Sequence, residues 1–191
     1  REINTYYLGA KKMNPDVELS ITWVYTWYDP GLERDAGLAM LNQGCDVLAQ
    51  HTDSPAPLQA AEELGKVGFG QASDQMKFAP KAQLTATIDN WGPYYIDKVG
   101  QVLDGTWTTG TYFGHMNEGA VQMAPFANMP ADVQAEAQRV KDAISAGELF
   151  GFTGPINKQD GTVFLKEGEV ATREQLDTMM FYVEGITAKQ P

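Results

Sequence analysis

Cysteine and histidine are scarce in this 191-residue sequence, which contains one cysteine, Cys45, and two histidines, His51 and His115. A single cysteine cannot form an internal disulfide, and its position before an apolar run indicates a small, buried side chain. Two histidines without a cysteine pair give little support to a transition-metal site. The sequence therefore gives no reason to expect a metal or another cofactor.

Basic residues are also few, because 14 Lys and Arg stand against 25 Asp and Glu, giving a net charge of −11. This charge repels phosphate backbones and anionic lipid surfaces, and no basic cluster offsets it locally. Nucleic acid is therefore excluded as an expected partner. A run of about 18 apolar residues, as a membrane span requires, is likewise missing.

Sequence motifs for covalent catalysis and nucleotide phosphates are absent: there is no G-x-S-x-G elbow, no P-loop and no G-x-G-x-x-G. His51, Asp53 and Ser54 contain the residue types of a catalytic triad. However, neighbouring residues on a strand point to opposite faces, and a triad is assembled from converging segments. Nucleophilic catalysis is not expected.

A repeated unit is present instead, in which an apolar run leads into a short polar tip and then a helix start. It occurs at 24–31, 47–57, 68–75 and 86–93. In an open parallel sheet the strands end on one edge, so the tips should lie together where α/β proteins bind ligands. The polar and aromatic residues of these tips are Trp27, Asp29, His51, Asp53, Ser73, Asp74, Asp89 and Trp91.

Apolar periodicity predicts alternating helices and strands over the first 105 residues, which is typical of a doubly wound parallel sheet of the α/β class. Strands are expected at 18–25, 46–50, 66–70, 83–88 and 119–126. Helices are expected at the N-terminus, after Asp29, after Ser54, from Gly92 and over 131–147. In the helix from Gly92, the residues expected to face the core are Tyr95, Val99, Val102 and Leu103. Near the C-terminus the sequence predicts a hairpin turn at Asp160-Gly161 and a helix capped by Thr172.

Two interpretations remain open for the aspartates and the rings at the tips. An Asp at a strand-to-helix junction commonly caps the helix, but several carboxylates at one edge would also accept hydrogen bonds from a donor-rich ligand. The rings of Trp27, Tyr28 and Trp91 suit stacking on a flat heterocycle, worth about 1–3 kcal/mol per stacked base. Packing between loops is the alternative for each ring.

Four motifs, TWYDP, GCDVLAQHTDSPAPLQAAEE, FGQASDQ and TATIDNWGPYY, resemble the Bmp/Med family of basic membrane lipoproteins. These are substrate-binding components of ABC importers for nucleosides and purines. The resemblance implies a two-lobed type I periplasmic binding protein with its ligand in the cleft between the lobes. On this basis residues 1–118 are expected to form the second lobe. Residues 119–191 are expected to be segments returning to the first lobe and hinge, whose N-terminal part would precede Arg1.

The resemblance also suggests the ligand. Trp27 stands where the family has an aromatic residue that stacks on the base, and Asp74 keeps one acid of a family motif. Ala72 replaces an earlier acid of that motif, and Asp89 lies near a position where nucleoside binders carry lysine. These departures favour a free base, adenine. The expected ligand-binding residues are Trp27, His51, Thr52, Asp53, Ser54, Asp74, Asp89, Asn90 and Trp91.

The expected function is therefore capture of a purine, without catalysis, for the membrane subunits of an ABC importer. The resemblance implies a periplasmic or cell-surface location, with a lipid anchor in the full-length form. Two alternatives stay open: a ligand-sensing domain of a regulator, and an enzyme that processes a nucleoside or sugar through paired aspartates.

Overall fold

The computed structural model describes residues 1–189 and divides the chain into two units. The terminal unit comprises Arg1–Trp23 with Leu149–Pro191, and the central unit comprises Val24–Glu148. The expected lobe boundary after residue 118 does not coincide with either division. The assignment of these segments to lobes of a larger protein stays a prediction.

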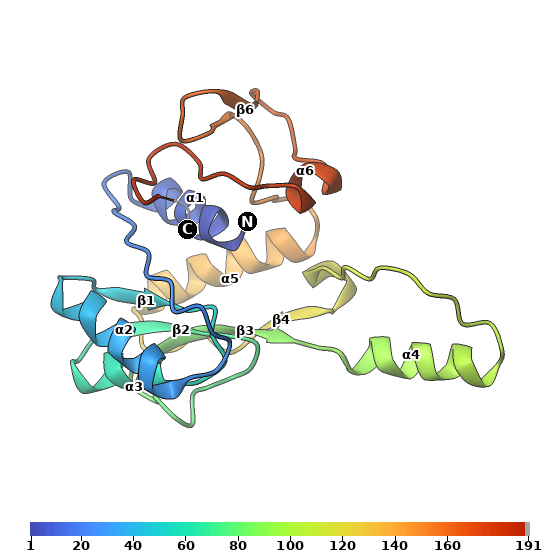
Figure 1. Cartoon of the computed structure of the whole chain (residues 1–191), viewed down its shortest axis with the longest axis horizontal. Coiled ribbons are helices and arrows are strands. Elements are labelled where there is room, and N and C mark those ends of the chain that lie inside the picture. The colour runs from blue at the N-terminus through green and yellow to red at the C-terminus, as the bar shows by residue number, and fades with distance from the viewer. Residues whose placement is uncertain (190–191) are drawn as a thin grey trace. The chain divides into compact units, whose positions relative to one another are not determined.

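A four-stranded sheet organises the central unit in the order β1 (Val47–Ala49), β2 (Val67–Gly70), β3 (Gln83–Asp89) and β4 (Val121–Met123) (Figure 1). The first three strands pair in parallel, and β4 pairs antiparallel with β3. The parallel α/β arrangement is confirmed. It places the carboxyl ends of β1, β2 and β3 on one edge.

Two helices, α2 (Pro30–Asn42) and α3 (Ala56–Glu63), pack with the sheet around a core of small and branched side chains. Gly68 shows how close the packing is, because a Cβ there would lie 2.7 Å from the Leu48 carbonyl oxygen and 2.9 Å from Leu58 Cδ2. Helix α2 starts at Pro30, as the sequence predicted, whereas α3 starts one residue after the expected Pro55, which is its N-cap residue. The core residues are Leu41, Leu48, Leu58, Ala60, Ala61, Ala79 and Ala82.

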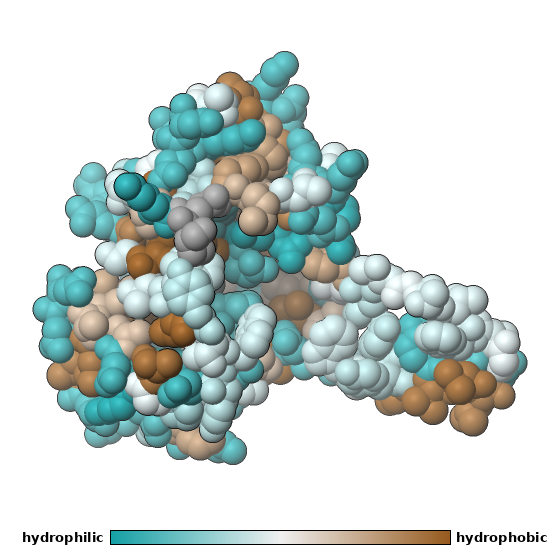
Figure 2. Space-filling model, viewed as in Figure 1, coloured by the Kyte–Doolittle hydropathy of each residue, from teal (hydrophilic) through white to brown (hydrophobic). Residues whose placement is uncertain are grey.

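Helix α4 (Gly92–Leu103) corrects an expectation about the core. All twelve of its residues are described, and none of them is buried. Leu103 is 81% exposed, and Figure 2 shows the apolar surface of this helix as a brown patch. Apolar periodicity identifies a face that can be buried, but it does not say what buries it. The four residues expected to face the core are therefore exposed: Tyr95, Val99, Val102 and Leu103.

Residues 18–25 correct a second expectation, since they are described throughout and form no strand. The alternation of apolar and polar residues that predicted a strand is nevertheless reflected in burial, since apolar residues face the core. Val17, Leu19 and Ile21 are half-buried against the core of the terminal unit. Pairing requires a neighbouring strand, and Tyr25 has a φ of 52°, which breaks the extended backbone.

The tip at 68–75 also differs from the expected unit, because turns rather than a helix follow it. The remaining helices of the central unit are the 3₁₀ turn η1 (Met116–Glu118) and α5 (Ala131–Ser145). Cys45 is half-buried rather than fully buried.

The terminal unit contains α1 (Glu2–Met13), β5 (Ile156–Asn157), β6 (Val163–Leu165) and α6 (Arg173–Asp177). The hairpin at Asp160-Gly161 is confirmed by antiparallel pairing of β5 with β6, and Gly161 takes a φ of 83°. The capping box of Thr172 is confirmed as well. The core residues are Tyr7, Phe152, Ile156, Leu165, Met179, Tyr182, Val183 and Ile186.

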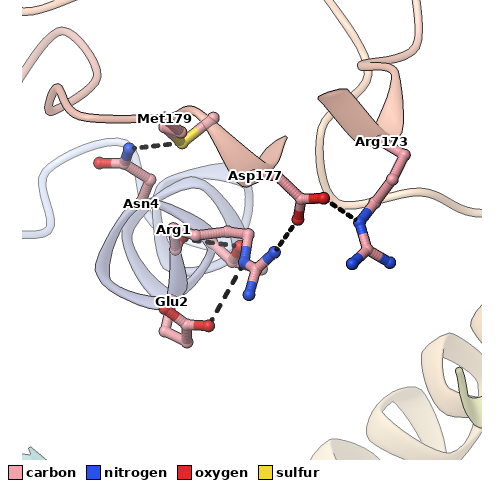
Figure 3. Close-up of polar contacts among 7 residues, drawn as sticks. Arg1, Glu2, Asn4, Arg173, Asp177 and Met179 are labelled. Carbon is pink, nitrogen blue, oxygen red and sulfur yellow. Dashed lines mark hydrogen bonds and ion pairs between the residues drawn. The ribbon is translucent and has the colours of Figure 1, made fainter. Parts of the chain in front are cut away.

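Polar contacts join the first helix of the terminal unit to its last segment. The buried Asn4 amide donates to the Phe181 carbonyl at 2.8 Å, and its oxygen accepts from the Val183 N–H at 3.2 Å. Figure 3 shows the contact of the same side chain with the Met179 sulfur, and Asp177 paired with Arg1 and Arg173. The exposed ion pairs contribute little to stability, whereas the buried amide satisfies a buried main-chain N–H and a part-buried carbonyl.

Replacing Asn4 with alanine should lower the free energy of unfolding by about 1–3 kcal/mol, because a buried N–H and a part-buried C=O lose their partner. Denaturant unfolding of the two proteins measures this difference. Asp177→Asn, which weakens only exposed pairs, is the control and should change stability by less than about 1 kcal/mol. Equal effects of the two substitutions would contradict the role assigned to Asn4.

The exposure of α4 leads to a prediction about its dynamics. A 12-residue helix without buried residues is marginally stable in water, so its backbone amides should exchange with deuterium much faster than those of α2 and α3. Hydrogen-exchange mass spectrometry of the chain measures this directly. Protection of α4 equal to that of α3 would show that its apolar face is covered in solution.

Candidate functional site

Loops at the carboxyl ends of β1, β2 and β3 carry most of the expected ligand-binding residues. The β1 loop contains His51–Ser54, the β2 loop contains Asp74, and β3 ends at Asp89 and is followed by Asn90. The segment before α2 joins the β1 loop through a hydrogen bond of 2.9 Å from the Asp53 N–H to the Trp27 carbonyl. The first tip thus reaches this edge although no strand precedes it.

Trp27, His51 and Asp53 form one exposed group. The Trp27 ring is 69% exposed, and its centroid lies 6.1 Å from that of His51 with the planes tilted by 56°. A large apolar ring left in water beside an imidazole and a carboxylate offers a surface for stacking together with acceptors for N–H donors. This group has the composition of a wall that binds a flat, polar molecule.

The aspartates of the tips play different roles. Asp29 caps α2 by accepting from the Leu32 N–H at 3.0 Å, which confirms the capping interpretation for this residue. Asp74 accepts from the Met76 N–H at 2.9 Å and from the Gln83 side chain at 2.8 Å. Asp53 and Asp89 are exposed, and in the described structure α3 and α4 begin without a side-chain cap bond.

Thr52 and Ser54 lie on the inner side of the β1 loop. Ser54 is fully buried, and its hydroxyl donates to the Glu33 carboxylate, so this side chain supports the loop instead of facing its exposed side. Thr52 is half-buried. Of the expected residues on this loop, His51 and Asp53 are therefore the exposed ones.

Asn90 and Trp91 belong to a separate part of the edge. The Asn90 amide donates to the Gly119 carbonyl at 2.9 Å and fixes the start of α4 to the segment before β4. Trp91 is grouped with tyrosine rings, among which Tyr94 and Tyr112 stack at 4.5 Å. The sequence pattern missed Tyr112 because it lies in an irregular segment, far from any tip.

Glu33 is a further residue that the sequence pattern missed. It is 2% exposed, and its two carboxylate oxygens accept from the Asp29 N–H at 2.8 Å and from the Ser54 N–H at 3.1 Å. Burial raises the pKa of this carboxyl, but hydrogen bonds from Ser54 and Asp29 outweigh it, so the pKa lies below its ordinary value. An acidic residue on the inner face of an amphipathic helix was the available signal.

Three glutamines are linked by hydrogen bonds: Gln50 after β1, Gln75 in the loop after β2 and Gln83 at the start of β3. Gln50 donates to the Gln75 side chain at 2.9 Å, and the Gln75 N–H donates to Gln83 Oε1 at 2.9 Å. Gln83 then donates to Asp74, so the chain of bonds runs from β1 to the exposed β2 loop. Buried, connected amides hold loop positions firmly. Within the described residues, the buried Gln50 Oε1 has no hydrogen-bond partner.

Residues 1–189 contain no group of three His, Cys, Asp or Glu side chains arranged to hold a metal ion. Among the same residues, none of the helices combines the length and apolar character that crossing a bilayer requires.

Comparison with known proteins identifies the family. The family model of the Bmp ABC transporter substrate-binding proteins, described as PnrA-like, matches residues 1–149. The chain belongs to this family. Its members are substrate-binding proteins, not enzymes, and the resemblance carried by the four motifs is confirmed.

The names of the relatives state different ligands. The chain is 52% identical to purine-binding protein BAB2_0673 of Brucella abortus over 99% of its length and 54% of the relative. It is 28% identical to the putative ABC transporter glucose-binding protein TsgA13 of Haloferax volcanii over 100% of its length and 46% of the relative. The chain thus spans about half the length of the curated relatives it matches.

A solved structure supports the fold. The transcriptional activator of the comK gene from Bacillus halodurans superimposes with a TM-score of 0.61 at 22% identity, over 75% of this chain and 50% of that one. An ABC transporter solute-binding protein from Conexibacter woesei gives a TM-score of 0.57 at 21% identity, over 75% and 49%. The shared fold is that of solute-binding proteins.

Glu33 leads to a prediction about acid stability. Because its pKa in the folded protein is lowered, its contribution is fully present above the unfolded value of 4.5 and is lost as the pH falls through the folded value. Glu33→Gln should therefore reduce stability at pH 7 and flatten the loss of stability below pH 4.5. Urea unfolding across this pH range measures both effects.

The control is Glu63→Gln, which removes an exposed carboxylate paired with Arg34. It should change the acid limb of the stability curve much less, because exposed pairs are weak and screened. An acid limb that is the same in the Glu33 variant and the wild type would contradict the assignment.

Proposed function

We propose that this chain forms part of a substrate-binding protein that captures a purine for an ABC importer. The observation that carries the proposal is the exposed Trp27 ring beside His51, at the carboxyl edge of a parallel sheet. The family and the purine-binding relative from Brucella abortus support the same ligand class.

The chemistry of the edge favours a base with several N–H donors. Stacking on Trp27 would supply affinity, and the exposed carboxylates of Asp53 and Asp89, with that of Asp74, would accept hydrogen bonds from ring N–H and amino groups. Adenine carries both kinds of donor. We therefore propose adenine as the ligand, with His51, Thr52 and Asn90 at the rim and Trp91 as a second aromatic wall.

The proposal extends to the complete protein. The ligand would lie between this lobe and a second lobe, and its differential affinity for the closed state would drive closure. The membrane subunits of the importer would recognise that closed state. The corresponding location is periplasmic or at the cell surface, with a lipid anchor on the full-length form.

A ligand-sensing domain of a regulator is the second candidate. The transcriptional activator protein med of Bacillus subtilis is 28% identical over 83% of this chain and 49% of the relative. A solved relative is also a transcriptional activator. In both candidate functions the same edge would bind a small molecule. They differ in whether an importer or a regulatory domain responds to the ligand-bound form.

Calorimetric titration with adenine, adenosine, inosine and glucose tests the ligand class. Adenine should bind most tightly, and Trp27→Leu should weaken its binding about 5- to 150-fold, corresponding to about 1–3 kcal/mol for a lost stacking surface. Trp107→Leu is the matched control, because this tryptophan is also half-exposed but lies beyond α4.

Tighter binding of a nucleoside would reject adenine and keep the purine class. Tighter binding of glucose, or an equal loss in both tryptophan variants, would reject the purine proposal. Reporter control by the full-length protein, without any effect of its deletion on purine uptake, would favour the regulator.

A further inference from the structure

We propose that Glu33 is a positioning residue that fixes Trp27 against His51 and so sets the affinity of the binding edge. This inference rests on the proposed function for the ligand, but the geometry it concerns can be tested without one. Glu33 itself is buried and touches no exposed face of the edge.

The carboxylate of Glu33 joins two segments that are far apart along the chain. One oxygen accepts from the Asp29 N–H at 2.8 Å, at the entry to α2. The other accepts from the Ser54 N–H at 3.1 Å and from the Ser54 hydroxyl, in the loop after β1. A single buried side chain therefore holds the start of α2 and the β1 loop together.

The two ligand-binding side chains lie close to these attachment points. Trp27 precedes Asp29 by two residues, and His51 precedes Ser54 by three. Between them the Asp53 N–H donates to the Trp27 carbonyl at 2.9 Å. The ring separation of 6.1 Å is thus fixed by one direct main-chain bond and by the Glu33 link behind it.

Only a carboxylate satisfies this arrangement. The three hydrogen bonds to the side chain all come from donors: two backbone N–H groups and the Ser54 hydroxyl. A glutamine at this position would turn its NH₂ group toward one of these donors and could accept from one segment only. The link between the two segments would then open while most of the volume of the side chain is kept.

Proton NMR of the two histidines provides a test that is independent of ligand. The Cε1–H of His51 should carry a ring-current shift from Trp27, which Trp27→Leu removes, and His51→Gln assigns the signal. His115, which contacts Phe113 instead, is an internal reference. Glu33→Gln should move the His51 signal toward its position in Trp27→Leu and leave the His115 signal unchanged.

The same variant should weaken adenine binding about tenfold, the change that corresponds to 1.4 kcal/mol. Leu41→Ala is the matched control, because Leu41 is also buried on α2 but belongs to the apolar core. It should lower stability without moving the His51 signal or the affinity. Ser54→Ala, which removes one of the donors, serves as a milder variant if Glu33→Gln fails to fold.

The proposal is overturned if Glu33→Gln, or Ser54→Ala in its place, leaves the His51 signal where it is in the wild type. It is also overturned if Leu41→Ala moves that signal equally, which would reveal a general effect of lost stability. Absence of purine binding by the wild-type protein would instead reject the proposed function, and the NMR result would still decide the role of Glu33.

Discussion

Parallel pairing of β1, β2 and β3 is the constraint on which the central unit depends. Parallel strands need a crossover connection, which α3 supplies between β1 and β2, and α3 packs closely here because Gly68 leaves room for Leu48 and Leu58. The same pairing brings the carboxyl ends of β1, β2 and β3 to one edge of the sheet. The exposed rings and carboxylates described above owe their proximity to this arrangement of the backbone.

A polar layer lies between that core and the exposed loops. Gln50, Gln75 and Gln83 are linked by hydrogen bonds, and Glu33 bonds to two loop segments, so a set of buried hydrogen bonds supports the loops. Such groups are costly to bury unless every partner is in place. In return the loops are held in defined positions, because hydrogen bonds are directional and apolar packing would tolerate several loop positions.

The sequence predicted local structure well and tertiary surroundings less well. Proline after Asp29, the turn at Asp160-Gly161 and the capping box of Thr172 depend on neighbouring residues, and all three were confirmed. The helix from Gly92 was placed correctly along the chain, but burial of its apolar face was not, because burial depends on a partner that periodicity does not name. The strand expected at 18–25 failed for the related reason that a strand needs another strand.

For the candidate site, the sequence predicted the exposed residues after the strands but not the buried residues that hold these loops in place. Trp27, His51 and Asp53 stand out as aromatic or charged residues after apolar runs, and the structure brings these three together. Glu33 and the three glutamines are ordinary in the sequence, since their importance comes from donors contributed by distant segments. Ser54 looked like an exposed tip residue, and the structure turns it inward toward Glu33.

The bonds of Asn4 have a consequence for synthesis on the ribosome. Its partners Phe181 and Val183 follow 177 and 179 residues later, so the terminal unit cannot complete its core until residue 183 has emerged. The central unit is contained between those ends, and its strand pairings are all available earlier. Since domains generally fold as units during synthesis, the inserted unit is ready to fold first, and α1 must wait in an incomplete state until the last segment arrives.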